Sequence, residues 1–188
     1  MPLCARCTGT FLGALLAFVA LYAIARGRCS GFPTWRVSAV LAGLMVWWAV
    51  DGANSFLSLA TGRAWLYAPS NTLRLITGMG CGLALGAVIH PLYQASMWRS
   101  AENRPVLEGM GQLALLAAIG AACVLLLLGW PGAPYELWAA LLFICVLGVF
   151  TLVNSIVAAM ILRREGLAVR VAELVPSTLV GLALSVVE

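Results

Sequence analysis

The sequence predicts an all-α, polytopic bundle of transmembrane helices, with six crossings as the preferred number and five as the alternative. Hydrophobic residues make up 63% of the 188 residues and charged residues only 10%, which leaves too little polar surface for a water-soluble globule of this size. The apolar residues form runs of the length that a bilayer crossing needs, about 20 helical residues. We expect one transmembrane domain over residues 1–188. Its expected spans are residues 8–25, 37–59, 71–93, 110–128, 135–162 and 167–187.

Composition also limits the partners. The net charge of +4 is spread along the chain without a basic run, which argues against nucleic acid as a partner. The lipid bilayer is the partner that the hydropathy requires, and other membrane protein subunits stay open. The first apolar run has no charged region before it beyond Arg6 and no Ala-x-Ala cleavage site, so we expect it to remain as a span.

The first span begins at a pair of thiols, Cys4 and Cys7. The first turn of a helix has free backbone N–H groups and the positive end of the helix dipole, which favour a thiolate. The pair could therefore be a redox dithiol, helped by the charge of Arg6. It could equally supply half of a site for zinc or another thiolate-bound metal, which needs two more ligands. A structural disulfide or a pair of buried thiols is the third interpretation.

The second span carries polar residues on one helical face. The spacings of three and four between them place these side chains on the same side of the helix, which cannot face lipid. These residues are Asp51, Asn54, Ser55 and Ser58.

The third span predicts a tight helix contact. Ser70 or Asn71 can cap its start. Along it an arginine, three glycines and the only histidine recur every fourth residue, and a stripe of small residues lets another helix approach closely. The stripe consists of Arg74, Gly78, Gly82, Gly86 and His90. We interpret the histidine, at the far end of the span, as a packing residue.

The remaining chain is less informative. The longest polar segment, residues 94–109, precedes an almost featureless fourth span, and a turn rich in helix breakers follows at 129–134. The fifth span contains Asn154 and Ser155. Residues 167–187 have a polar stripe and a proline, so they form either a sixth span, which we prefer, or a partly interfacial helix.

Two buried charges lie at similar depth on consecutive spans. Asp51 and Arg74 are expected to form an ion pair, because either charge alone costs about 3 kcal/mol or more near the hydrocarbon. The pair could simply hold the second and third spans together. Alternatively, it belongs to a functional pocket near the two thiols, because intramembrane ionisable groups often mark functional sites. That buried polar site would comprise Asp51, Asn54, Asn71 and Arg74.

The arginines predict the orientation. With six spans, one side of the membrane receives most of them, so the positive-inside rule makes that side cytoplasmic. We therefore expect a multi-pass protein of the cell inner (plasma) membrane with both termini outside the cytoplasm. The cytoplasmic group is Arg26, Arg28, Arg36, Arg99, Arg104, Arg163 and Arg164, and the external group is Arg6, Arg63 and Arg74.

Residues 4–9, Cys-Ala-Arg-Cys-Thr-Gly, resemble the box that marks an uncharacterised, domain-of-unknown-function family of bacterial and archaeal multi-pass membrane proteins. Asp51-Gly52 and residues 71–78 are further family-like pieces, and the resemblance covers roughly residues 2–90. The chain departs from the family pattern at Thr10-Phe11. Family members also usually carry a segment with a Cys-His pair before the box, so more ligands could lie upstream. The resemblance implies no activity.

The leading functional hypothesis is a small membrane protein with a polar site at the external face, acting through thiol redox chemistry or a bound metal. Cys4 and Cys7 are the candidate catalytic or metal-binding residues, and whether the protein is an enzyme stays open. The alternatives are a non-catalytic accessory subunit of a larger membrane complex and a transporter of ions or small solutes. A carrier is disfavoured because the chain shows no duplicated half.

Overall fold

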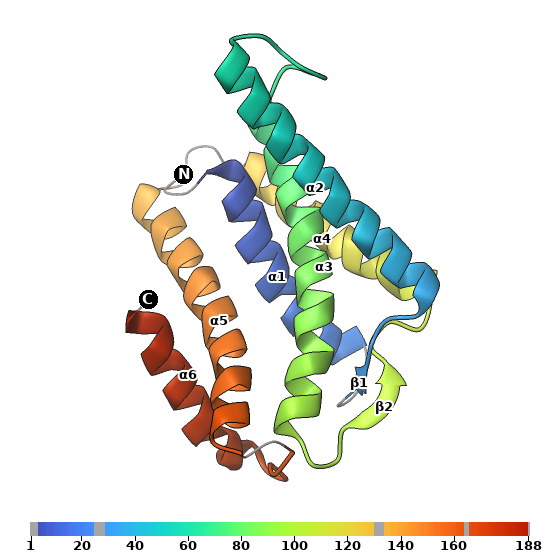
Figure 1. Ribbon diagram of the computed structural model, residues 1–188, viewed down its shortest axis with the longest axis vertical. Helices are drawn as coiled ribbons and strands as arrows, with labels where there is room; N and C mark the ends of the chain where they lie inside the picture. The colour runs from blue at the N-terminus through green and yellow to red at the C-terminus, as the bar shows by residue number, and fades with distance from the viewer. Residues whose placement is uncertain (1–3, 25–28, 130–133, 164–165, 188) are drawn as a thin grey trace.

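The computed structural model describes residues 4–24, 29–129, 134–163 and 166–187, and these residues form a helical bundle (Figure 1). The prediction of an all-α membrane bundle is confirmed. The expected charged turn at residues 26–28, most of the turn at 129–134 and Arg164 lie outside the described residues. The helices are α1 (Ala5–Ile24), α2 (Trp35–Thr61), α3 (Asn71–Met97), α4 (Met110–Gly129), α5 (Tyr135–Ile161) and α6 (Val175–Val187).

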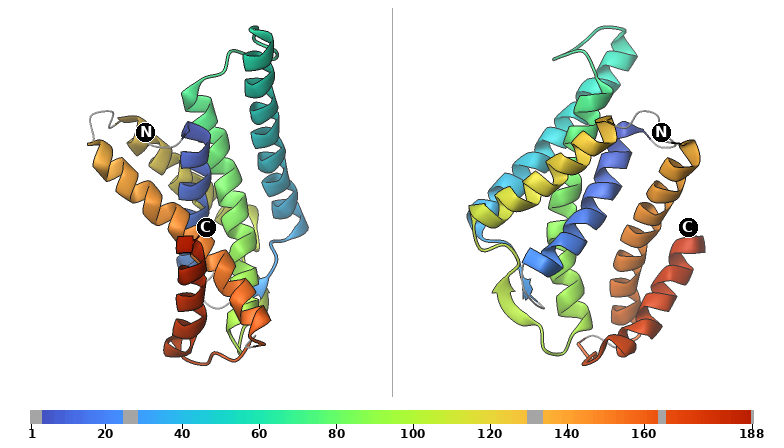
Figure 2. Two further views of the ribbon diagram at one scale, coloured as in Figure 1. Left: turned by 60° about the vertical axis from the view of Figure 1, so that its left-hand side comes forward. Right: turned by 180° about the vertical axis from the view of Figure 1, so that it is seen from behind.

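Five of the helices, α1 to α5, are long and apolar enough to cross a membrane. They alternate in direction, so the start of α1, the end of α2 and the start of α3 lie at one end of the bundle (Figures 1 and 2). The sixth expected segment is broken by a 3-10 turn, Val171–Leu174, and α6 has 13 residues. A helix of that length rises about 20 Å, less than the hydrocarbon core of about 30 Å.

Helix α3 is the centre of the bundle. It is the most buried of the five long helices, and α1 lies along it (Figure 2). A Cβ atom at Gly86 would lie 2.5 Å from the carbonyl oxygen of Ala14, and one at Gly13 would lie 2.7 Å from that of Met79. Cβ atoms at Gly78 and Gly82 would also collide with the backbone of α1. The stripe predicted from the sequence is thus the surface on which α1 rests.

Helix α6 packs on α5 at the flank of the bundle (Figure 1). A Cβ atom at Gly181 would lie 2.7 Å from the backbone nitrogen of Ser155, so the two helices meet closely at this point. One turn further along, Asn154 Nδ2 donates to Ser185 Oγ at 3.0 Å. The polar residues noted on these two segments therefore face each other.

Two short strands, β1 (Cys29–Gly31) and β2 (Glu102–Pro105), join the two connections at the opposite end of the bundle. They pair in parallel, with Cys29 opposite Glu102, and Val106 donates its backbone N–H to Gly31 at 2.9 Å. We expected no strands here. Segments of three and four residues carry too few side chains for an alternating pattern to be recognised.

Candidate functional site

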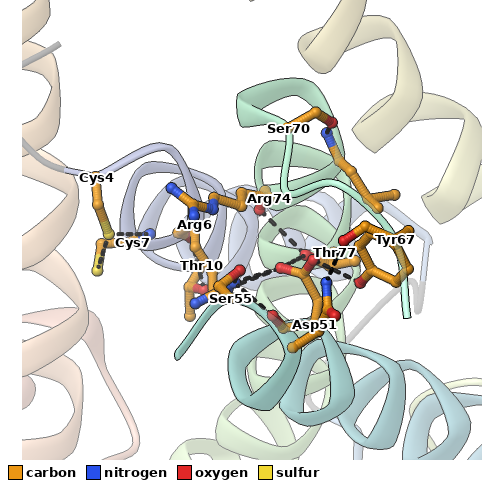
Figure 3. A network of polar contacts seen from close by, with 12 residues as sticks. Cys4, Arg6, Cys7, Thr10, Asp51, Ser55, Tyr67, Ser70, Arg74 and Thr77 are labelled. Carbon is orange, nitrogen blue, oxygen red and sulfur yellow. Dashed lines mark hydrogen bonds and ion pairs between the residues drawn. The ribbon is translucent and has the colours of Figure 1, made fainter. Parts of the chain in front are cut away.

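A network of polar side chains lies at the end of the bundle where α1 begins (Figure 3). Its members come from α1, α2, α3 and the turn that joins α2 to α3. Figure 3 shows the network centred on Asp51, with the two thiols of residues 4 and 7 on the far side of Arg6.

Asp51 forms an ion pair with Arg6. The Asp51 side chain is fully buried and that of Arg6 is 19% exposed. Arg6 Nε donates to Asp51 Oδ2 at 3.1 Å, and Nη2 reaches the same oxygen. The same Nη2 lies 3.0 Å from the backbone oxygen of Asp51 and 2.9 Å from Ser55 Oγ. One guanidinium thus holds both the side chain and the backbone of α2.

Two hydroxyl groups complete the surroundings of the Asp51 carboxylate. Tyr67 donates its phenolic O–H to Oδ1 at 2.7 Å, and Thr77 Oγ1 lies 3.3 Å from Oδ2. Burial of Tyr67, and then its hydrogen bond to the carboxylate, raise the pKa of the phenol above its usual value. Both carboxylate oxygens have donors, as a buried charge requires.

Asn54 fixes the turn that carries Tyr67. Its fully buried side chain accepts the backbone N–H of Leu66 at 2.9 Å and donates to the backbone oxygen of Tyr67 at 3.0 Å. Ser70 then caps α3 by accepting the N–H of Leu73 at 3.2 Å. The polar face of α2 therefore orders the connection to α3.

The ion pair expected between Asp51 and Arg74 does not form. Arg6 takes the place of Arg74, because Gly78 lets the first turn of α1 lie directly on α3. The Arg74 side chain points from α3 toward the start of α1 (Figure 3). Its Nε is buried and has no hydrogen-bond partner among the described residues.

The two thiols lie close together at the start of α1. Their Sγ atoms are 2.7 Å apart, and the backbone N–H of Cys7 lies 3.3 Å from the sulfur of Cys4. Cys4 is exposed and Cys7 is half-buried. Partial burial alone would raise the pKa of Cys4, but the hydrogen bonds from Cys7 and the charge of Arg6 outweigh it, so that the pKa of this thiol lies below its usual value.

The predicted site residues fall into two neighbouring groups. Cys4, Asn71 and Arg74 line one pocket of about 430 Å³. Asp51 and Asn54 are buried behind Arg6 and do not line this pocket. The thiols and the buried carboxylate thus lie on opposite sides of one arginine.

The first part of the chain matches a known family model. Residues 1–88 match a family model described as predicted membrane protein (DUF2085). The resemblance expected from the cysteine box is confirmed. No curated protein matches the chain, and no solved structure does. The residues of the polar network and the three glycines of the stripe all fall inside the matched residues 1–88, the DUF2085 segment.

His90 lies beyond the DUF2085 segment and far from the thiols along α3. Its ring is buried against Phe18 and Tyr22, with ring centroids 5.4 and 5.0 Å away. Across the part of the chain that the structure describes, no three His, Cys, Asp or Glu side chains are grouped to hold a metal ion. The neighbouring thiols of Cys4 and Cys7 could supply two ligands, whereas a structural zinc site has four.

Sequence reasoning missed three members of the network in the DUF2085 segment. Arg6 was considered only for its effect on the thiols, and Tyr67 and Thr77 had no assigned role. A useful indication was present for Arg6. Gly9 in the first span and Gly78 in the third are both small, which allows the two backbones to touch and brings Arg6 level with Asp51.

Proposed function

We propose that the protein carries out thiol–disulfide exchange at the membrane surface, with Cys4 and Cys7 as the reacting pair. The observation that carries this proposal is the 2.7 Å separation of the two Sγ atoms at an exposed helix start. The atoms need to move by less than about 1 Å to reach the bond length of a disulfide. The lowered pKa of Cys4 makes it the attacking thiol.

The oxidant in this exchange is a disulfide bond of a partner molecule, which accepts the two electrons that the Cys4–Cys7 pair loses. The Cys4 thiolate attacks one partner sulfur, the partner S–S bond breaks, and the released thiolate takes up a proton. Cys7 then loses its proton and attacks Cys4 Sγ, which forms the internal disulfide and releases the second partner thiol. The partner is reduced by two electrons and the pair is oxidised by two. The reverse sequence oxidises a partner dithiol.

The Arg6–Asp51 pair supports this chemistry by positioning. Arg6 lies between the two cysteines in the chain, and its side chain is held by the carboxylate and by Ser55. The first turn of α1 is therefore fixed against α2 and α3. A fixed turn keeps the second thiol beside the first, which raises the effective concentration for closure of the disulfide.

Thiol trapping tests the proposal. The protein in mild detergent is equilibrated with defined ratios of reduced and oxidised glutathione, and free thiols are then counted by maleimide mass labelling. We expect two thiols to disappear together at one potential. Cys4→Ser and Cys7→Ser should each abolish this paired loss, whereas Cys123→Ser, distant in the fourth span, should keep it. A pair that stays reduced in oxidised glutathione, or stays bonded in excess dithiothreitol, would contradict exchange.

A further inference from the structure

We infer that the protein binds a phosphate-bearing lipid at this end of the bundle, with the phosphate at Arg74 and one hydrocarbon chain in the groove between α2 and α4. The inference goes beyond thiol exchange, because it concerns a ligand. It rests on three observations. Arg74 has no ion pair with any described residue, an apolar groove lies beside its pocket, and one residue lines both the pocket and the groove.

The first observation is the charge of Arg74. The ion pairs among the described residues join Arg6 to Asp51 and Arg104 to two glutamates, so no carboxylate neutralises Arg74. Its Nε is buried, with no hydrogen-bond acceptor in the part of the chain that the structure describes. A guanidinium at the edge of the hydrocarbon needs an anion, and a phosphate accepts the bidentate hydrogen bonds that arginine offers. The nearby polar groups of Asn71 and Thr72 line the same pocket.

The second observation is the groove. Helices α2 and α4 both pack on α3, and they leave between them a hollow of about 370 Å³ whose lining is almost wholly apolar. Gly80 and Gly120 form part of its surface, with Leu44 and Trp47 on one side and Leu125 on the other. The shape and the apolar lining fit a hydrocarbon chain better than a soluble, polar ligand.

The third observation is continuity. Leu128, near the end of α4, lines the Arg74 pocket and also the apolar groove. A ligand with a charged head and a long apolar tail can therefore occupy the Arg74 pocket and the apolar groove at the same time. Charge complementarity selects the head, and the groove selects the tail. A free phosphate ion would use only the first part of the site, and an uncharged lipid only the second.

Three probes separate these parts in a thermal-shift titration of the detergent-purified full chain. They are 1-oleoyl-lysophosphatidic acid, which has both head and tail, monoolein, which has the same tail without phosphate, and inorganic phosphate. We expect saturable stabilisation by lysophosphatidic acid, at least about tenfold weaker binding of monoolein, and no effect of inorganic phosphate at the same concentrations. Equal stabilisation by the two lipids would overturn the assignment of the head, and stabilisation by phosphate alone would overturn that of the tail.

Two pairs of variants locate the site. Arg74→Gln should weaken lysophosphatidic acid about tenfold or more and leave monoolein unchanged, whereas Arg63→Gln, exposed in the turn after α2, should change neither. Ala121→Trp should fill the groove and weaken both lipids, whereas Ala122→Trp on the same helix points elsewhere and should weaken neither. Each variant is compared with its own lipid-free melting curve. Unchanged binding in Arg74→Gln or in Ala121→Trp would overturn the inference.

Discussion

The backbone carbonyl of Arg6 lies against Gly78, at a point where a Cβ atom on α3 would collide with it. This contact sets the position of α1 along the axis of α3. It therefore determines that Arg6, and not Arg74, forms the ion pair with Asp51. The polar network, the thiol pair and the Arg74 pocket all depend on this placement.

Neutralising Asp51 should destabilise the fold. In Asp51→Asn the largely buried guanidinium of Arg6 loses its counter-ion, and removing one partner of a buried pair costs about 3–5 kcal/mol. Thermal unfolding in detergent measures the loss. Arg6→Gln combined with Asp51→Asn should recover part of it. The exposed pair of Arg104 and Glu108 supplies the control, since Glu108→Gln should leave unfolding unchanged. Equal melting of Asp51→Asn and wild type would contradict the role of the pair.

Removing the Tyr67 hydroxyl should cost stability and change its pH dependence. Tyr67→Phe loses a hydrogen bond to a carboxylate, worth about 1.5–3 kcal/mol. Because the pKa of Tyr67 is raised in the folded protein, its contribution is complete below the unfolded pKa of about 10 and is lost as the pH rises through the folded pKa. As the pH rises above about 10, the free energy of unfolding of the wild type should therefore fall more steeply than the free energy of unfolding of Tyr67→Phe. Tyr135→Phe, at an exposed position, should behave as wild type.

A methyl group in the α1–α3 contact should loosen the bundle. Gly86→Ala would place a Cβ atom 2.5 Å from the carbonyl oxygen of Ala14 and 2.6 Å from the Cβ of Ala17, so α1 must shift, at a cost of about 1–3 kcal/mol. In contrast, a Cβ atom at Gly43 meets nothing within 4 Å. Gly43→Ala should stabilise α2 by about 0.5–1 kcal/mol. Melting temperatures that move in the same direction for the two variants would argue against close packing.

Cys4 should react with alkylating agents at a lower pH than an ordinary thiol. Its lowered pKa depends in part on hydrogen bonds from Cys7. In reduced protein the rate of Cys4 carbamidomethylation, followed by peptide mass spectrometry, should reach half its maximum at a lower pH than that of an unstructured cysteine peptide. Cys7→Ala should move this midpoint upward, and Cys7→Ser, which keeps a hydroxyl donor, should move it less. A midpoint that is the same in all three proteins would show that Cys7 does not stabilise the thiolate.

The orientation predicted from the arginines can be tested through the same thiol. If the start of α1 faces away from the cytoplasm, a membrane-impermeant maleimide should label Cys4 in intact, reductant-treated cells. Cys4→Ser identifies the labelled site. Labelling that requires cell lysis would reverse the assignment.

The sequence predicted an all-α membrane bundle correctly because hydropathy is a local property. Helix α3 begins at Asn71, as expected, and the glycine stripe was visible as a period of four. The prediction that Asp51 pairs with Arg74 was wrong. Two residues at equal depth in the membrane can point in different directions, because depth does not determine how each helix is rotated about its axis. The choice between Arg6 and Arg74 is made by the contact at Gly78, which joins residues distant in the chain. The break before α6 was not predicted, because three of the four residues in the 3-10 turn at Val171–Leu174 are apolar and continue the hydrophobic pattern of the helix.

The pairing of Arg6 with Asp51 also bears on biogenesis. Arg6 is synthesised 45 residues before its partner, so α1 leaves the ribosome with a cation that has no counter-ion. Either charge resists entry into the hydrocarbon alone, and together they are neutral. The first two helices are therefore favoured to enter the lipid as a hairpin, with α3 following to bring the Thr77 hydroxyl to Asp51.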